Sequence, residues 1–69
     1  MKVSARNNLK GTIKSLTVGL VNAEVVIEVA PGVDIVSTIT KASAEAMELA
    51  EGKEVYAMVK ASNIMLAVD

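Results

Sequence analysis

The stretch from Asn22 to Val29 constrains the fold of this chain more than any other, because its side chains alternate with a period of two. Val25 and Ile27 would share an apolar face, while Glu24 and Glu28 would lie on the opposite face. This is the pattern of a β-strand with one side buried. The chain is therefore expected to be built around a β-sheet.

A turn signal follows this strand. In Ala30-Pro31-Gly32-Val33, proline presets the second turn position and glycine accepts the positive φ that a type II turn needs at the third. The second arm of this hairpin is expected from Asp34 to Thr40, which is again β-branched and alternating. Lys10 to Thr17 is a weaker strand upstream that ends near Gly19. These three strands predict an antiparallel meander.

The composition changes from Lys41 to Ala50, where Ala, Glu and Met replace the β-branched residues. These residue types favour a helix. Thr40 is suited to cap its start, and Gly52 to form the turn that follows its end. One short helix is therefore predicted after the third strand.

Two apolar runs close the sequence, Val55 to Lys60 and Ile64 to Val68, and Ala61-Ser62-Asn63 joins them. Both runs are expected to be buried strands. Five short strands with one helix between the third and fourth give the element order of a small OB-like barrel. The predicted fold class is thus mainly β, in a single domain over residues 1–69.

The small size of the chain limits what it can bury. A fold of 69 residues hides only roughly 60% of its unfolded surface, and here there is no cysteine to add a disulfide. Yet 52% of the residues are apolar, with Tyr56 as the one aromatic. We therefore expect part of the apolar surface to be buried between subunits of a homo-oligomer.

Charge and hydropathy exclude two kinds of partner. Seven basic and eight acidic residues give a net charge of −1, which offers no field for a nucleic-acid backbone or an acidic membrane. No apolar run reaches half of the roughly 20 residues of a membrane span, and Met1 to Lys10 lacks the apolar core of a signal peptide. We expect a cytoplasmic protein that binds neither nucleic acid nor membrane.

The residue types also argue against catalysis. Histidine and cysteine are absent, so the commonest general base, the thiol nucleophile and the usual zinc ligands are missing. Glu24 and Glu28 lie four strand residues apart, about 13 Å, which is too far for a carboxylate dyad. Glu45 and Glu48 on the helix favour surface charge over a metal site. No enzyme, cofactor or metal coordinated by side chains is expected.

Neutral and cationic hydrogen-bond donors gather at the ends of the predicted elements. They are Ser4, Arg6, Thr40, Ser43, Lys60 and Ser62. Thr40 stands beside the backbone N–H groups of Lys41, Ala42 and Ser43, where a helix start favours an anion. The alternatives are that Thr40 and Ser43 merely cap the helix, and that Lys60 and Arg6 are ordinary surface cations.

The opening Ser4-Ala5-Arg6-Asn7-Asn8-Leu9-Lys10-Gly11 resembles the S-A-R-N-x-L-x-G start of the molbindins, the Mop or TOBE-type domains. The resemblance continues through Val21 to Val25, the Ile39-Thr40 to Ser43 element and the Val59-Lys60-Ala61-Ser62 strand end. Four pieces in the same order at the same intervals are far more specific than one short motif.

The resemblance implies a five-stranded barrel with a short helix, assembled as a hexamer (a trimer of dimers) that stores or buffers molybdate in the cytoplasm. It implies an oxyanion between subunits, molybdate or tungstate, as the bound ligand. The corresponding positions here are Ser4, Arg6, Thr40, Ser43, Lys60 and Ala61. Several relatives carry serine directly after the lysine, so either the Ala61 amide alone donates or Ser62 turns inward.

Two other classes of function stay open on the sequence. An OB-like module that binds nucleic acid would need a basic groove and stacking aromatics, against which the single Tyr56 argues. The other class is a purely structural oligomerisation subunit, or a regulatory domain detached from a larger transport or transcription protein. The start at Met1 weakens the latter expectation.

Overall fold

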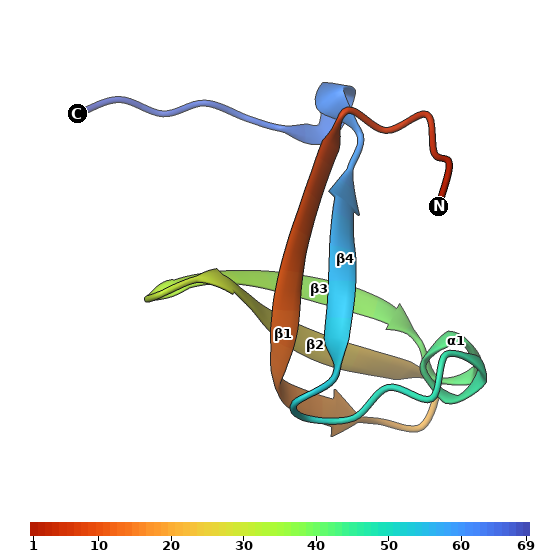
Figure 1. Cartoon of the computed structure of the whole chain (residues 1–69). Coiled ribbons are helices and arrows are strands. Elements are labelled where there is room, and N and C mark those ends of the chain that lie inside the picture. Colours follow the sequence, from red (N-terminus) through yellow and green to blue (C-terminus); the bar gives the residue numbers. More distant parts are fainter.

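A computed structural model describes all 69 residues, and Figure 1 shows its course. The elements are β1 (Asn7–Val18), β2 (Asn22–Ala30), β3 (Val33–Thr40), α1 (Lys41–Ala46), β4 (Glu54–Val59) and the 3-10 turn η1 (Ala61–Asn63). The strands form one antiparallel sheet in the order β3-β2-β1-β4. Neither helical segment is long and apolar enough to cross a membrane.

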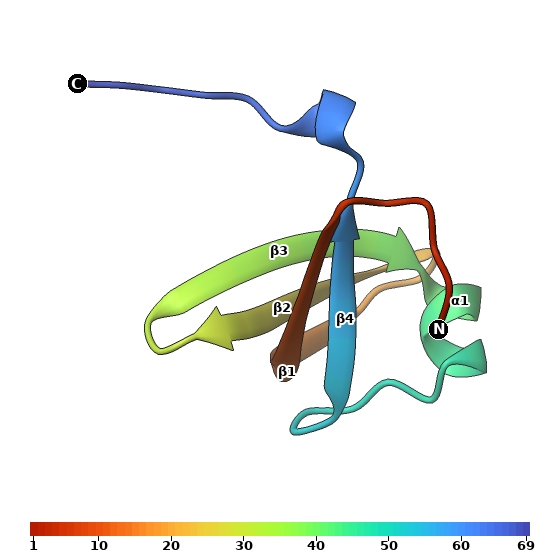
Figure 2. The same cartoon turned by 45° about the horizontal axis from the view of Figure 1, so that its top comes forward.

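The long strand β1 is shared between two neighbours. Its first half pairs with β4, from Asn7 opposite Val59 to Thr12 opposite Glu54, and its second half pairs with β2. The pairing with β2 shifts register around Lys14, which marks a bulge. Because β1 bends there, the β1–β4 pair crosses the β2–β3 pair steeply, and the sheet curls into half of a barrel (Figures 1 and 2).

Gly11 lies where β1 passes close to β2. A Cβ atom at this position would be 2.6 Å from the Glu28 carbonyl oxygen and 2.7 Å from Cγ2 of Ile27. Both distances are shorter than van der Waals contact, so only glycine lets the two strands approach this closely. The curl of the sheet therefore depends on Gly11.

The core of this half-barrel is small. Only six residues are buried, and all are apolar: Ile13, Ala23, Val25, Ile27, Ala44 and Ala57. Fifteen large apolar side chains remain exposed in the single chain, which agrees with the expectation that its apolar surface exceeds its interior. Without Phe or Trp, few residues can fill the space that the curled sheet encloses.

The predicted meander is confirmed. β2 turns its Val25 and Ile27 side chains into the core and leaves Glu24 and Glu28 exposed. The two-residue turn between β2 and β3 has Gly32 at φ 75°, as a type II turn requires. The mainly β, OB-like fold class and the place of the helix between the third and fourth strands are confirmed as well.

The helix α1 ends four residues earlier than the expected Ala50. Glu48 adopts a positive φ of 54°, its N–H donates to the Glu45 carbonyl, and the Leu49 N–H donates to that of Ala44. These two bonds form a Schellman end. Leu49 packs against the core, so burial of its side chain overrides the helical propensity of the residues around it.

The prediction of a fifth strand from Ile64 to Val68 is wrong for the single chain. After η1 this segment leaves the sheet and runs away from it in both views (Figures 1 and 2). A strand forms only beside another strand that accepts and donates its backbone hydrogen bonds. Leu66 and Val68 stay 94% and 97% exposed, so the apolar pattern marks a segment that has no partner within its own chain.

We predict that Gly11→Ala lowers the free energy of unfolding by about 1–3 kcal/mol, because the added methyl group forces β1 away from β2. Urea unfolding at fixed protein concentration measures this. Gly19→Ala is the comparison variant, because a Cβ atom there would lie 3.2 Å from its nearest neighbour, the Asn22 carbonyl oxygen, a milder overlap that should cost less stability. Equal stability of Gly11→Ala and wild type would contradict the role given to this glycine.

Candidate functional site

The pairing of β1 with β4 brings two cations together. Asn7 is opposite Val59 in this ladder. Arg6 precedes Asn7 and Lys60 follows Val59, so both cations lie at the same end of the sheet. Both line one pocket with Ser4, Ala5, Met58, Ala61 and Ser62. We call Ser4, Arg6, Lys60, Ala61 and Ser62 the strand-end cluster.

No carboxylate neutralises this pocket. The ion pairs are elsewhere: Lys10–Glu54 at 3.2 Å, Lys14–Asp34 at 3.0 Å and Lys41–Glu45 at 3.9 Å. Arg6 and Lys60 take part in none of them, and the lining contains no acidic residue. Two exposed positive charges therefore face one pocket without a counter-charge from their own chain, which makes it attractive to an anion.

The paired lysines differ from these two cations in their electrostatic surroundings. A hydrogen bond to Glu54, together with the charge of that carboxylate, raises the pKa of the Lys10 ammonium above its ordinary value. A hydrogen bond to Asp34 and its charge do the same for the pKa of Lys14. Lys10 and Lys14 thus already have anionic partners on the sheet surface.

Backbone and hydroxyl donors accompany the two cations. η1 follows Lys60 directly, and the Asn63 N–H donates to the Lys60 carbonyl at 2.9 Å. The N–H groups of Ala61 and Ser62 come before this first bond of the turn, so they have no acceptor within it. Ser62 lines the same pocket as Ala61.

A second set of donors lies at the start of α1. Thr40 is the N-cap, and its Oγ1 accepts a hydrogen bond from the Ser43 N–H at 3.0 Å and donates to Ser43 Oγ at 2.8 Å. The Lys41 N–H donates to the Val21 carbonyl. Two of the three N–H groups expected to be free are therefore already used. We call Thr40 and Ser43 the helix-start cluster.

The two clusters lie apart in one chain. η1 lies at one end of the molecule, and α1 lies at another in both views (Figures 1 and 2). The pocket of the strand-end cluster includes neither Thr40 nor Ser43. The structure thus brings five of the seven candidate residues together and leaves two elsewhere.

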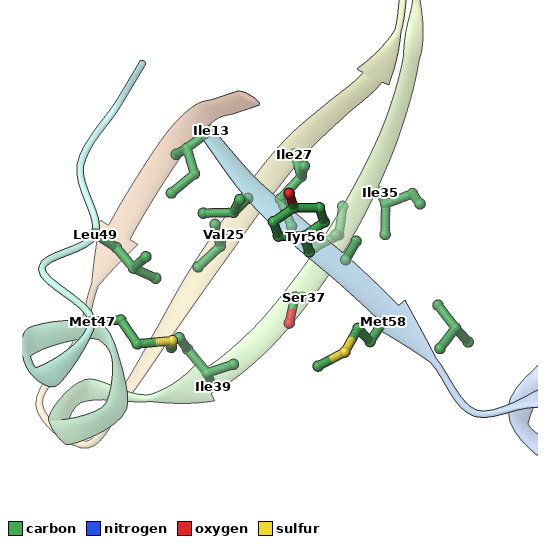
Figure 3. A pocket seen from close by; sticks show the side chains of 14 residues that line it. Ile13, Val25, Ile27, Ile35, Ser37, Ile39, Met47, Leu49, Tyr56 and Met58 are labelled. Carbon is green, nitrogen blue, oxygen red and sulfur yellow. The ribbon is translucent and has the colours of Figure 1, made fainter. Parts of the chain in front are cut away.

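A further pocket, on the concave face of the sheet, was not predicted from the sequence. Thirteen of its fourteen lining residues are hydrophobic, and they come from all four strands and the segment after α1. Figure 3 shows Tyr56, Met58, Ile35 and Ile39 around it, with the Ser37 hydroxyl on its β3 wall. The alternation of Ile35, Ser37 and Ile39 signals one inward face of β3 but cannot reveal that this face stays uncovered.

Comparisons with known proteins match nearly the whole chain. Residues 3–66 match the TOBE domain family, a range that includes every candidate residue. Over all 69 residues the chain is 51% identical to the molybdenum transport protein ModE of Azotobacter vinelandii, but it spans only 26% of that longer protein.

Two solved structures are similar in fold. MopII from Clostridium pasteurianum superposes with a TM-score of 0.92 at 43% identity, over 97% of this chain and 100% of that one. The cytoplasmic molybdate-binding protein ModG, in a form with molybdate bound, gives a TM-score of 0.83 at 44% identity, over 96% of this chain and 53% of that one. The same fold thus occurs both as a chain of about this length and as part of a longer one.

We predict that removing the Thr40 hydroxyl and removing the Ser43 hydroxyl affect the stability of the chain differently. Thr40→Ala removes the acceptor of the Ser43 N–H and should lower the free energy of unfolding by about 1 kcal/mol. Ser43→Ala keeps its own N–H and the cap, so it should leave stability nearly unchanged. Urea unfolding compares them, and a larger loss in Ser43→Ala than in Thr40→Ala would contradict this assignment of the cap.

Proposed function

The chain belongs to the TOBE domain family, as its resemblance to the molbindins indicated, and from this premise we propose that it binds molybdate or tungstate reversibly. The strand-end cluster carries this proposal. In it, two cations without carboxylate partners share a pocket with two serine hydroxyls and the backbone of η1. The names of ModE and ModG, one linked to molybdenum transport and one to molybdate binding, point to the same ligand class.

A tetrahedral dianion suits this set of donors. Its four oxygens accept hydrogen bonds from guanidinium, ammonium, hydroxyl and amide groups, and bonds to charged groups are the stronger ones. Two positive charges balance the two negative charges of the ion. No metal or covalent step is needed, so the proposed activity is binding without catalysis.

The site is incomplete within one chain. The strand-end cluster is exposed and offers donors from one side only. The helix-start cluster lies elsewhere and offers the hydroxyl proton of Ser43, because the Thr40 hydroxyl already donates to Ser43 Oγ. We propose that a second copy closes the site by adding its Thr40 and Ser43, which also shields the ion from water and strengthens each contact. The assembly that the molbindin resemblance implies is a hexamer built as a trimer of dimers.

The proposed biological role is storage or homeostasis of the oxyanion in the cytoplasm. The similarity to ModG, described as cytoplasmic, supports this location. Sulfate presents the same charge and the same four acceptors, so selection against it would rest on the size of the closed site. Molybdate and tungstate are too alike in size and charge for this set of donors to separate them.

Isothermal titration calorimetry with molybdate tests the proposal. Arg6→Ala and Lys60→Ala should each weaken binding roughly 10- to 100-fold, because each removes a charge-assisted hydrogen bond worth about 1.5–3 kcal/mol. Ser43→Ala should weaken binding less, since a neutral hydroxyl contributes less. Lys10→Ala is the matched control, because Lys10 is an exposed strand cation that pairs with Glu54 outside the pocket.

Unchanged affinity in both Arg6→Ala and Lys60→Ala would remove the strand-end cluster from the site. An equal loss of affinity in Lys10→Ala would point to general surface charge instead of a defined site. Absence of molybdate and tungstate binding by the wild type would contradict the proposed function itself.

A further inference from the structure

The turn between β1 and β2 presents apolar side chains to solvent. Val18, Leu20 and Val21 are 51%, 96% and 72% exposed. Turns are usually built from Gly, Pro, Asn, Asp and Ser, and residues 18–23 include no charged side chain. Leucine and valine side chains gathered at the tip of a turn are typical of a surface that another molecule covers.

Two backbone hydrogen bonds fix this turn. The Gly19 N–H donates to the Asn22 carbonyl at 2.8 Å, and the Lys41 N–H donates to the Val21 carbonyl at 2.7 Å. The Leu20 and Val21 side chains therefore belong to a backbone that is already held in place. Covering them with a partner surface requires little additional ordering, which favours their burial in an interface. We call Leu20 and Val21 the apolar turn.

The apolar turn lies beside the helix-start cluster. The residue that donates to the Val21 carbonyl, Lys41, directly follows Thr40. Asn22, the residue after Val21, is opposite Thr40 in the β2–β3 ladder. The turn and the start of α1 are neighbours in both views (Figures 1 and 2). A subunit that approaches Thr40 and Ser43 from outside therefore also approaches the apolar turn.

We propose that the apolar turn forms a wall of the closed oxyanion site and determines its selectivity for molybdate and tungstate over sulfate. The proposal rests on the proposed function, in which the strand-end cluster of a second copy meets the helix-start cluster. The wall contributes no hydrogen bond to the ion. Its role is to keep water out of the site, so that the ion is held by protein donors alone.

The strand-end cluster has apolar neighbours of its own, which makes a second copy the occupant of this surface. Ala5 and Met58 line the pocket together with the two cations, and Met58 is 50% exposed. Val3, which is 43% exposed, directly precedes Ser4. When the two clusters meet, apolar side chains would flank the ion on both sides of the contact. The contact that supplies the second set of donors thus also buries the apolar turn.

Removal of water separates ions that share the same charge and the same four acceptors. The free energy needed to take an ion out of water rises as its radius falls, because a smaller ion holds its hydration water more strongly. Sulfate is smaller than molybdate or tungstate, so transfer into a dry site costs sulfate more. A site that admitted water would return part of the hydration to each ion and reduce this difference. Dryness therefore adds to the effect of site size on selectivity.

Competition calorimetry tests the wall by measuring the ratio of the sulfate dissociation constant to the molybdate dissociation constant. Val21→Thr and Leu20→Asn make the turn polar at nearly the same volume and leave every proposed donor in place. Each should lower the ratio at least about fivefold, because a polar wall holds water near the ion. Val33→Thr is the matched control, because Val33 is an exposed valine at the other end of the β2–β3 hairpin from Thr40. It should leave the ratio within about twofold of the wild-type value.

The ratio separates selectivity from assembly. A substitution that only weakens assembly raises both dissociation constants by the same factor and leaves their ratio unchanged. An unchanged ratio in both turn variants, or an equal fall in Val33→Thr, would overturn the wall, and so would a wild type that binds sulfate as tightly as molybdate. Each of these results leaves the proposed function standing. A wild type that binds neither ion refutes the proposed function, and the wall with it.

Discussion

The register between β1 and β4 is the constraint on which the rest of the structure depends. Because Asn7 is opposite Val59, the residues beyond each strand end meet, and Arg6 comes to share a pocket with Lys60. The same pairing uses only the first half of β1 and leaves its second half to β2, across the close approach at Gly11. The β1–β4 ladder therefore sets the pocket of cations, and the division of β1 between two neighbours sets the curl of the sheet.

The open side of the sheet and the divided donor clusters have a common origin. A chain of 69 residues with a single aromatic buries six residues and cannot fill the concave side of its own sheet. Its candidate donors likewise fall into two clusters that one chain does not bring together. Under the proposed function, association of copies would complete the anion site.

Local patterns predicted most of the elements. The alternation around Val25 and Ile27 predicted β2 and its inward face, and Gly32 predicted the hairpin turn. Each of these features is determined by a few neighbouring residues. The early helix end at Ala46 and the unpaired residues 64–68 were not predictable in this way. They depend on the burial of Leu49 and on the absence of a neighbouring strand, which are properties of the assembled fold.

For the candidate site, the residue types and the molbindin resemblance identified the donors, but only the β1–β4 register shows which of them share a pocket. Complementation between variants tests the divided site most directly. Arg6→Ala/Lys60→Ala chains and Thr40→Ala/Ser43→Ala chains would be dissociated, mixed, reassembled and titrated with molybdate. The account predicts that each variant alone binds poorly and that the mixture regains tight sites, which combine the intact strand-end cluster of one chain with the intact helix-start cluster of the other. A mixture that binds no better than its separate components would contradict it.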